Sequence, residues 1–370
     1  MSRAREFADL AGSADAGGLT GRNIVINGAM QVAQRSTSET GLGAAAGYFT
    51  LDRFNMSINA ASAGRYTMSQ SDVTDLEGFS NALKIQCTTA DTSIAAGEVL
   101  ILSQRVEGQN IQTLKSTSTS SRAFTISFYA KSNESRAISL EARFSNGTNR
   151  QAATVHTIGT SWARYTMTVA AASSIQIDND NSNEMQINFF LHAGSDYTSG
   201  TIQGSSLGAA DNTKRAAGIG SIFASTSNFI EITGLQMELG EQATPFEHRS
   251  LHDEQLRCFR YYYDARFGSN DGGAYSPGRD EQYGHVRACI AEFPVKMRAT
   301  PTVSIQSSSA NSMDRFGRGQ EECFPKADNV HADHFQNIVK YTSSAQTTTA
   351  NWTDSGLYIN RGGYKADAEL

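Results

Sequence analysis

Three aromatic residues late in the chain have the sequence surroundings of sugar-binding side chains. Tyr283, Trp352 and Tyr358 stand near serine, asparagine and arginine, in segments whose glycine and proline content indicates loops. An exposed aromatic ring stacks on the apolar face of a sugar, while the sugar hydroxyls bond to neighbouring amides and charged groups. We therefore predict these three residues as ligand-binding. The same residues would also suit an interface between chains, and the sequence leaves both interpretations open.

Two other stretches carry metal-ligand residue types without a complete ligand set. Residues 178–184 place oxygen-bearing side chains at alternate positions, as a calcium loop does, but Asn183 and Phe189 stand where an EF-hand needs glycine and glutamate. His331 and His334 are spaced i, i+3, and no third ligand accompanies them. We expect a solvated loop and surface or interface histidines, with no metal and no cofactor. Structural calcium at the acidic loop is the alternative.

Catalytic chemistry has little support in the sequence. No phosphate-binding loop is present. Glycoside hydrolysis would need two carboxylates across a cleft, and no pair can be placed among the acidic candidates Asp52, Glu107, Glu141, Glu231 and Glu238. We therefore expect a protein that is not an enzyme, and a glycoside hydrolase is the alternative.

The stretch Asp52-Arg53-Phe54 is the most distinctive local motif. We interpret it as an ion pair between Asp52 and Arg53 at a strand end, with Phe54 in the core; contact with a glycan is the alternative. We expect Trp162 to pack inside the sandwich as a large strand anchor.

Composition excludes several classes of protein. The net charge of −6 argues against a nucleic-acid-binding surface. No run approaches the ~20 apolar residues of a membrane span, and the first residues lack the apolar core of a signal peptide. The four cysteines have no paired spacing and are expected to be buried thiols. We therefore expect synthesis in a cytoplasm and no membrane insertion.

Short alternating apolar runs recur through the first two thirds of the chain without interleaved helices, which indicates a β-sandwich or barrel. The predicted strands are 54–58, 65–70, 82–87, 99–106, 124–131, 137–144, 164–169, 185–192 and 229–239. In the run 124–131, Phe124, Ile126 and Phe128 share one face and are predicted to point into the core.

The five prolines all lie at or after position 245, and aromatic residues are dense just after Ser250. This shift predicts a boundary near Ser250 between a sandwich (23–250) and a smaller β-rich domain (251–370). Residues 1–22 are expected to form a short helical or extended segment before the sandwich. Within 229–239, Gly234 sits where the alternation changes phase and predicts a bulge. Pro245, which lacks an N–H, is predicted to end the pairing of that strand.

Several stretches, in order along the chain, together resemble one family. These are NIVINGAMQVAQR, YFTLDRFNM, VLILSQRVEG, FTISFYAKS, TSWARYTMTV, MQINFFLHAG, FIEITGLQMELGEQATPFEHRS and LRCFRYYY. They resemble bacteriophage tail fibre or virion spike proteins with a carbohydrate-binding-module-like jelly-roll domain, over roughly residues 20–265. The resemblance implies an all-β jelly-roll sandwich followed by a second β-rich domain.

The same resemblance implies a functional setting. It implies a homotrimeric fibre or spike subunit in a virion, made in the bacterial host cytoplasm. The N-terminus would attach to other tail or baseplate proteins, and the C-terminal domain would face the host and bind its surface polysaccharide. Two alternatives stay open: a tailspike enzyme that depolymerises polysaccharide, and a purely architectural connector or decoration protein.

Overall fold

The computed structural model describes residues 21–59, 62–146, 149–267, 279–280, 286–307, 323–328, 331–341 and 362–370. The chain divides into two compact units, one reaching to Glu254 and including Leu370, the other Gln255–Glu369. The predicted attachment segment, except for its last two residues, lies outside the described residues.

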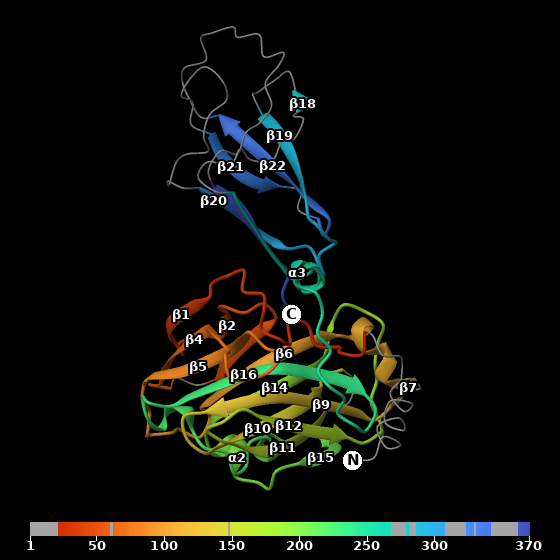
Figure 1. Cartoon of the computed structure of the whole chain (residues 1–370). Coiled ribbons are helices and arrows are strands. Elements are labelled where there is room, and N and C mark those ends of the chain that lie inside the picture. Colours follow the sequence, from red (N-terminus) through yellow and green to blue (C-terminus); the bar gives the residue numbers. More distant parts are fainter. Residues whose placement is uncertain are drawn as a thin grey trace. The chain divides into compact units, whose positions relative to one another are not determined.

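The first unit is a sandwich of two antiparallel sheets (Figure 1). Its six-stranded sheet consists, in spatial order, of β1 (Ser38–Leu42), β4 (Arg65–Asp72), β5 (Asn81–Thr89), β16 (Phe229–Leu239), β9 (Phe124–Ser132) and β12 (Ala163–Val169). Its seven-stranded sheet consists of β15 (Gly204–Ala209), β11 (Arg150–Ile158), β10 (Arg136–Phe144), β14 (Asn183–Ala193), β6 (Val99–Glu107), β3 (Phe54–Asn59) and β2 (Gly47–Tyr48).

Smaller elements complete this unit. A short three-stranded sheet joins β13 (Ala172–Ser173), β8 (Ser120–Ser121) and β7 (Lys115–Thr117). The helical pieces are α2 (Ser195–Thr198) and the 3₁₀ turns η1 (Gly108–Leu114), η2 (Asn212–Lys214) and η3 (Ile222–Ala224). No helix within the described ranges is long and apolar enough to cross a membrane.

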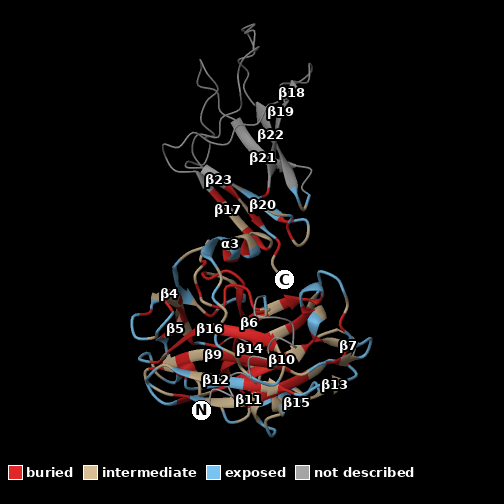
Figure 2. Ribbon diagram, turned by 45° about the vertical axis from the view of Figure 1, so that its right-hand side comes forward, coloured by how far each residue is buried: buried red, intermediate tan, exposed pale blue. Residues whose placement is uncertain are grey.

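The core lies between the two sheets, where the central strands are buried along most of their length (Figure 2). Phe124, Ile126 and Phe128 are fully buried, as the alternation predicted. Across the sandwich, the ring of Phe128 meets that of Phe189 edge-on at 4.9 Å between centroids. Strands of alternating pattern thus bury their apolar face against the opposite sheet.

The all-β sandwich prediction is confirmed, and each of the nine predicted strands is present with ends shifted by at most two residues. The segment 23–28 is not a strand, although Val25 is buried and Ile24 N–H donates to the Met237 carbonyl. Strand β11, which pairs with all nine residues of β10, was missed.

The bulge at Gly234 is also confirmed. The register of β16 on β9 shifts between Thr233 and Gln236, and Gly234 has φ +60°. A Cβ at Gly234 would lie 2.8 Å from the rings of Phe79 and Tyr129, so a side chain is excluded there by space as well as by conformation. The role given to Pro245 was wrong, because β16 already ends at Leu239.

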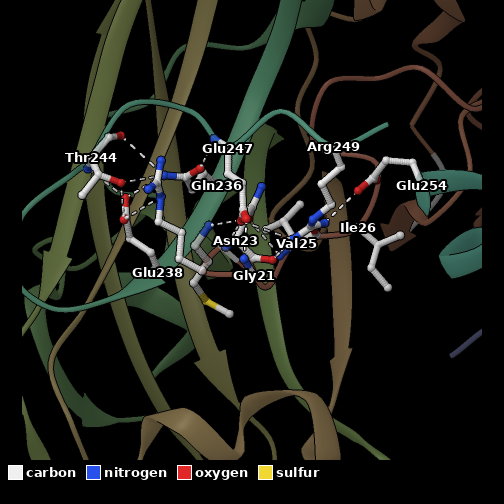
Figure 3. A network of polar contacts seen from close by, with 12 residues as sticks. Gly21, Asn23, Val25, Ile26, Gln236, Glu238, Thr244, Glu247, Arg249 and Glu254 are labelled. Atoms are coloured by element: carbon white, nitrogen blue, oxygen red, sulfur yellow. Dashed lines mark hydrogen bonds and ion pairs between the residues drawn. The ribbon is translucent and has the colours of Figure 1, made fainter. Parts of the chain in front are cut away.

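After β16 the chain forms a strap, defined here as residues 240–254, that runs beside the first described residues (Figure 3). Glu247 accepts from Asn23 N–H at 2.7 Å, and its own N–H donates to Gln236 Oε1 at 2.8 Å. Arg249 donates to the Val25 carbonyl at 3.0 Å and to Glu254 at 2.7 Å. These bonds satisfy backbone groups that no sheet ladder serves, which explains the polar residues of this stretch.

The second unit contains α3 (Leu251–Phe259) in part, and two described sheets. One joins β17 (Tyr262–Phe267), β23 (Gly362–Asp367) and β20 (Thr302–Ser307); the other joins β18 (Arg279–Asp280), β19 (Val286–Glu292), β22 (His334–Tyr341) and β21 (Cys323–Asp328). Tyr364 is 7% exposed and packs with Phe293 and Tyr263. The ring of Tyr364 is therefore part of the core of this unit.

Candidate functional site

The outer face of the seven-stranded sheet carries an unusual set of planar polar side chains. On β10, Leu140 and Ala142 point into the core, so Glu141 and Arg143 point outward. On β14, Phe189 is in the core and Asn188 is on the outer face. Glu141, Arg143 and Asn188 thus lie side by side on the outer face of two central strands of one sheet.

Four of these residues form a line across the strands, here named the Gln–Arg row. Gln151 of β11 pairs with Arg143 of β10, Arg143 with Gln186 of β14, and Gln186 with Arg105 of β6. Residues directly opposite in an antiparallel pair have Cβ atoms about 4.5–5.5 Å apart. The row therefore presents alternating amide and guanidinium groups on one continuous strip.

The middle of the row is not engaged by the protein. Arg143 and Gln186 are both partly buried, and neither side chain makes a hydrogen bond or ion pair with any residue that the structure describes. The outer members differ: Gln151 donates to the Asp211 carbonyl at 2.8 Å, and Arg105 donates to the main-chain oxygen of Leu370, which belongs to the same unit. Arg143 and Gln186 are thus the two members of the row whose side chains make no hydrogen bond, while Gln151 Oε1 and Arg105 Nε are single atoms without a partner.

Next to this row lies a closed buried network. Glu141, 0% exposed, accepts from Arg215 Nε at 2.7 Å and Nη2 at 2.8 Å, and from Asn188 Nδ2 at 2.7 Å. Ser103 donates to Asn188 Oδ1 at 2.6 Å. A buried carboxylate needs such a bidentate partner to offset its desolvation.

Arg215 reaches Glu141 from the segment that follows α2. Its guanidinium carbon lies 4.8 Å from the centre of the Phe190 ring and 5.9 Å from that of Tyr197, within cation–π range. The Ser139 hydroxyl donates a hydrogen bond to the Arg215 carbonyl oxygen at 2.6 Å. The segment therefore covers the part of the face beside the Gln–Arg row, and both oxygens of Glu141 accept hydrogen bonds.

On the outer face of the six-stranded sheet, charged side chains pair with one another. Lys131 lies 3.0 Å from Asp75 and 3.3 Å from Glu231, and its ammonium sits 4.9 Å from the ring centre of Trp162. The Trp162 indole N–H donates to Asp75 at 2.8 Å. Trp162 packs on this outer face beside Phe79, so its predicted place inside the sandwich was wrong.

One buried group has the composition of a hydrolytic triad. His192 Nδ1 lies 2.7 Å from Ser221 Oγ, and its Nε2 lies 3.2 Å from Glu98 Oε2. The Ser221 hydroxyl, however, already accepts from Phe223 N–H at the start of η3, and the imidazole is 0% exposed against the Phe223 ring. Burial also lowers the pKa of His192. This group joins η3 to β14, because its members satisfy one another.

The acidic loop has a buried carboxylate at its end. Asn146 Nδ2 donates to Asp178 at 2.6 Å and to Glu184 at 3.0 Å. Burial, and then the charges of Asp178 and Asp180, raise the pKa of Glu184, although the bond from Asn146 opposes this. Among the residues that the structure describes, no group of three or more His, Cys, Asp or Glu side chains is placed to hold a metal ion.

The residues singled out from the sequence are scattered. Tyr283, Trp352 and Tyr358 lie outside the described residues, so their predicted binding role is untested. Glu141 is on the outer face of the seven-stranded sheet, whereas Glu231 lies on the outer face of the other sheet.

The Asp52 motif is embedded in the first unit. Phe54 is buried, as predicted, and Arg53 donates to the Arg105 carbonyl at 2.7 Å. Asp52 accepts from the Gln34 N–H at 3.0 Å. The ion pair between Asp52 and Arg53 remains a prediction. The pair Arg143–Gln186 was not predicted from the sequence. The available signal was that both residues lie at outward-facing positions of predicted strands.

Comparison with known proteins adds only distant structural matches. No family model and no curated protein matches the chain. Among solved structures, the enzymatically active domain of bacteriophage CBA120 tailspike protein 4 matches with TM-score 0.29 and 12% identity, over 59% of this chain and 21% of that chain.

Two carbohydrate-binding modules match at a similar level. TmCBM61, solved in complex with beta-1,4-galactotriose, has TM-score 0.28 and 10% identity, over 60% of this chain and 100% of its own. The family 11 module from Clostridium thermocellum has TM-score 0.27 and 12% identity, over 58% and 99%. Scores this low carry no weight for function, and the sandwich is defined by its own strand pairing.

Proposed function

We propose that the protein binds glycans through the outer face of its seven-stranded sheet. The observation that carries this proposal is the cross-strand pair Arg143–Gln186, whose amide and guanidinium groups have no partner in the described part of the chain. Planar donors and acceptors of this kind suit sugar hydroxyls, which both donate and accept hydrogen bonds. The rigid neighbouring network of Glu141 and Arg215 fixes the strands that carry them.

We propose further that this binding serves attachment of a phage or phage-like virion to its host, with the chain as a homotrimeric fibre or spike subunit. Support for this setting comes from the sequence resemblance of residues 20–265 alone. In this proposal the N-terminus joins other virion proteins and the protein acts by binding, without catalysis. The carboxylate of Glu141 fits that view, since Arg215 and Asn188 already engage both of its oxygens.

A matched pair of glutamine variants tests the binding site. Gln186 and Gln86 are both partly buried and lie on central strands, but on the outer faces of different sheets. Purified full-length protein is applied to a glycan array, together with Gln186→Ala and Gln86→Ala. We expect binding that Gln186→Ala weakens and Gln86→Ala leaves unchanged. Absence of binding to every glycan, or an equal loss in both variants, would contradict the proposal.

The virion setting has a separate test. Antibodies against the purified protein, applied to particles released by the bacterial strain that carries the gene, should label one structure on each particle in electron micrographs. Labelling of soluble material with no particle label would contradict the proposed location without affecting the glycan site.

A further inference from the structure

Arg143 is a surplus cation on the proposed binding face. It lies two residues beyond Glu141 on β10, on the same side of the sheet. The oxygens of Glu141 are taken by Arg215 and Asn188, so the carboxylate nearest in sequence is not available to Arg143. Glu141 therefore makes no ion pair with Arg143 and acts on it only as a nearby charge.

The next carboxylate on this face, that of Glu184, makes no ion pair with Arg143 either. Glu184 lies two residues before Gln186 on β14, and its oxygen Oε2 accepts from Asn146. Its neighbours in charge are Asp178 and Asp180, and it makes no ion pair with Arg143 in the described part of the chain. Glu184 is thus turned into the acidic loop.

The surroundings of Arg143 disfavour an unpaired cation. Burial, together with the positive charge of Arg215, lowers the pKa of Arg143, with a smaller opposing effect from Glu141. The amides that flank it in the Gln–Arg row, Gln151 and Gln186, carry no charge.

A carboxylate is the group that best complements such an arginine. The guanidinium fork matches a carboxylate through two parallel hydrogen bonds, and these charge-assisted bonds are stronger than those to a neutral hydroxyl. Gln186, directly across from Arg143, can bond to the ring hydroxyls of the same sugar unit.

We propose that the ligand of this face is an acidic glycan, a polysaccharide with carboxylate-bearing sugar units, and that Arg143 pairs with its carboxylate. This inference rests on the proposed glycan-binding function and specifies the class of glycan.

The test compares acidic polymers with a neutral form of the same polymer. Binding of the full chain is measured by biolayer interferometry on immobilised polygalacturonate, alginate and hyaluronate, and on fully methyl-esterified polygalacturonate. Dextran and galactan serve as neutral polymers. The variants are Arg143→Gln, Arg143→Lys and, as control, Lys84→Gln, which removes one positive charge from the outer face of the other sheet. Melting curves check that each variant is folded.

We expect binding to at least one acidic polymer and none to the methyl ester. Loss of a charge-assisted contact should weaken binding at least about tenfold in Arg143→Gln. Arg143→Lys should bind at an intermediate level because it keeps the charge without the fork, and Lys84→Gln should bind as the unchanged protein does.

Three results would overturn the inference. Arg143→Gln could bind as well as the unchanged protein, or Lys84→Gln could lose as much, which would indicate unspecific charge attraction. Neutral polymers could be bound in a manner that depends on Gln186; the proposed function would then stand and the acidic ligand would be wrong. Absence of binding to every polymer would contradict both.

Discussion

Arg215 and Glu141 form a bidentate pair, with Nε–Oε1 at 2.7 Å and Nη2–Oε2 at 2.8 Å, on the outer face of a β-sheet. The pair connects a covering segment to β10, and both residues are at most 7% exposed. Both oxygens of Glu141 accept hydrogen bonds from Arg215 or Asn188, and Glu141 forms no ion pair with Arg143. The Arg215–Glu141 pair therefore holds a covering segment over one part of the face, and the adjoining part around Arg143 is not covered by that segment.

Removing the charge of Glu141 should strongly destabilise the first unit. Glu141→Gln leaves Arg215 buried without a counter-charge, and breaking a buried pair in this way costs about 3–5 kcal/mol. Urea unfolding of the full chain, followed by a probe of the first unit, measures the change. Lys214→Gln is the control, because the pair of Lys214 with Asp211 is exposed and worth about 0–1 kcal/mol. Equal small effects in the two variants would mean that the Glu141 pair does not stabilise the fold.

The core makes a second stability prediction. Phe128 is 0% exposed, stacks on Tyr165 at 5.4 Å between centroids and meets Phe189 at 4.9 Å. Phe128→Ala should therefore cost about 3–5 kcal/mol of unfolding free energy. Thr166→Ala, at an exposed position of β12, should change it by no more than about 0.5 kcal/mol. A Phe128→Ala effect as small as that of Thr166→Ala would contradict the observed packing.

The sequence predicted the sandwich well because its strands alternate. In FTISFYAKS the apolar residues recur at every second position, and the observed strand has those residues in the core. Strand β11, RQAATVHTI, was missed for a physical reason: its core-facing Ala152 and its outer-face neighbour Ala153 are both small and apolar, which erases the alternation. Pairing with β10 and β15 stabilises this strand instead.

The proposed binding face could not be predicted from the sequence, for a different reason. Alternation shows which residues of one strand share a face, but Arg143 and Gln186 become neighbours only through the register of strands more than forty residues apart. Arg215 joins Glu141 from a segment without regular alternation. The sequence favoured aromatic residues in loops as binding residues, because one aromatic residue can be recognised without knowing its neighbours in space. A row of planar polar groups forms only when several strands pair.

The buried carboxylate of Glu184 gives a pH-dependent prediction. Burial raises its folded-state pKa above the usual value near 4.5. The folded state then binds the proton more tightly than the unfolded state, so this group favours folding below pH 4.5 and that contribution is lost as pH rises through the raised pKa. Glu184→Gln, which mimics the protonated form, should raise the melting temperature at pH 7.

The same comparison at lower pH provides the check. The difference between Glu184→Gln and the unchanged protein should shrink as pH falls towards 4, since both then carry a neutral side chain. Calorimetric melting at a series of pH values measures it. A lower melting temperature for Glu184→Gln at pH 7 would show that the ionised carboxylate has a compensating partner, such as a bound cation.

The oligomeric state is predicted to be a trimer. The resemblance to fibre subunits and the aromatic residues after Ser250 both led to this expectation. Part of that aromatic content, Tyr261 and Tyr364 among it, is buried within the chain itself, so the interface needs less of it. Light scattering on the purified full chain should give three chains per particle. A stable monomer at micromolar concentration would contradict the fibre assignment.

The aromatic residues of the C-terminal domain provide the last prediction. If Tyr283, Trp352 and Tyr358 stack on sugars, each substitution by alanine should lose about 1 kcal/mol or more of contact energy at each site. Three identical sites in a trimer would enlarge that loss in binding to intact host cells, because avidity multiplies weak contacts. Binding to an acidic polymer through Arg143 should be unaffected, since that face belongs to the first unit. Light scattering must accompany the assay: dissociation of the alanine variants into monomers would place these aromatics at the interface between chains and leave the sheet face as the glycan site.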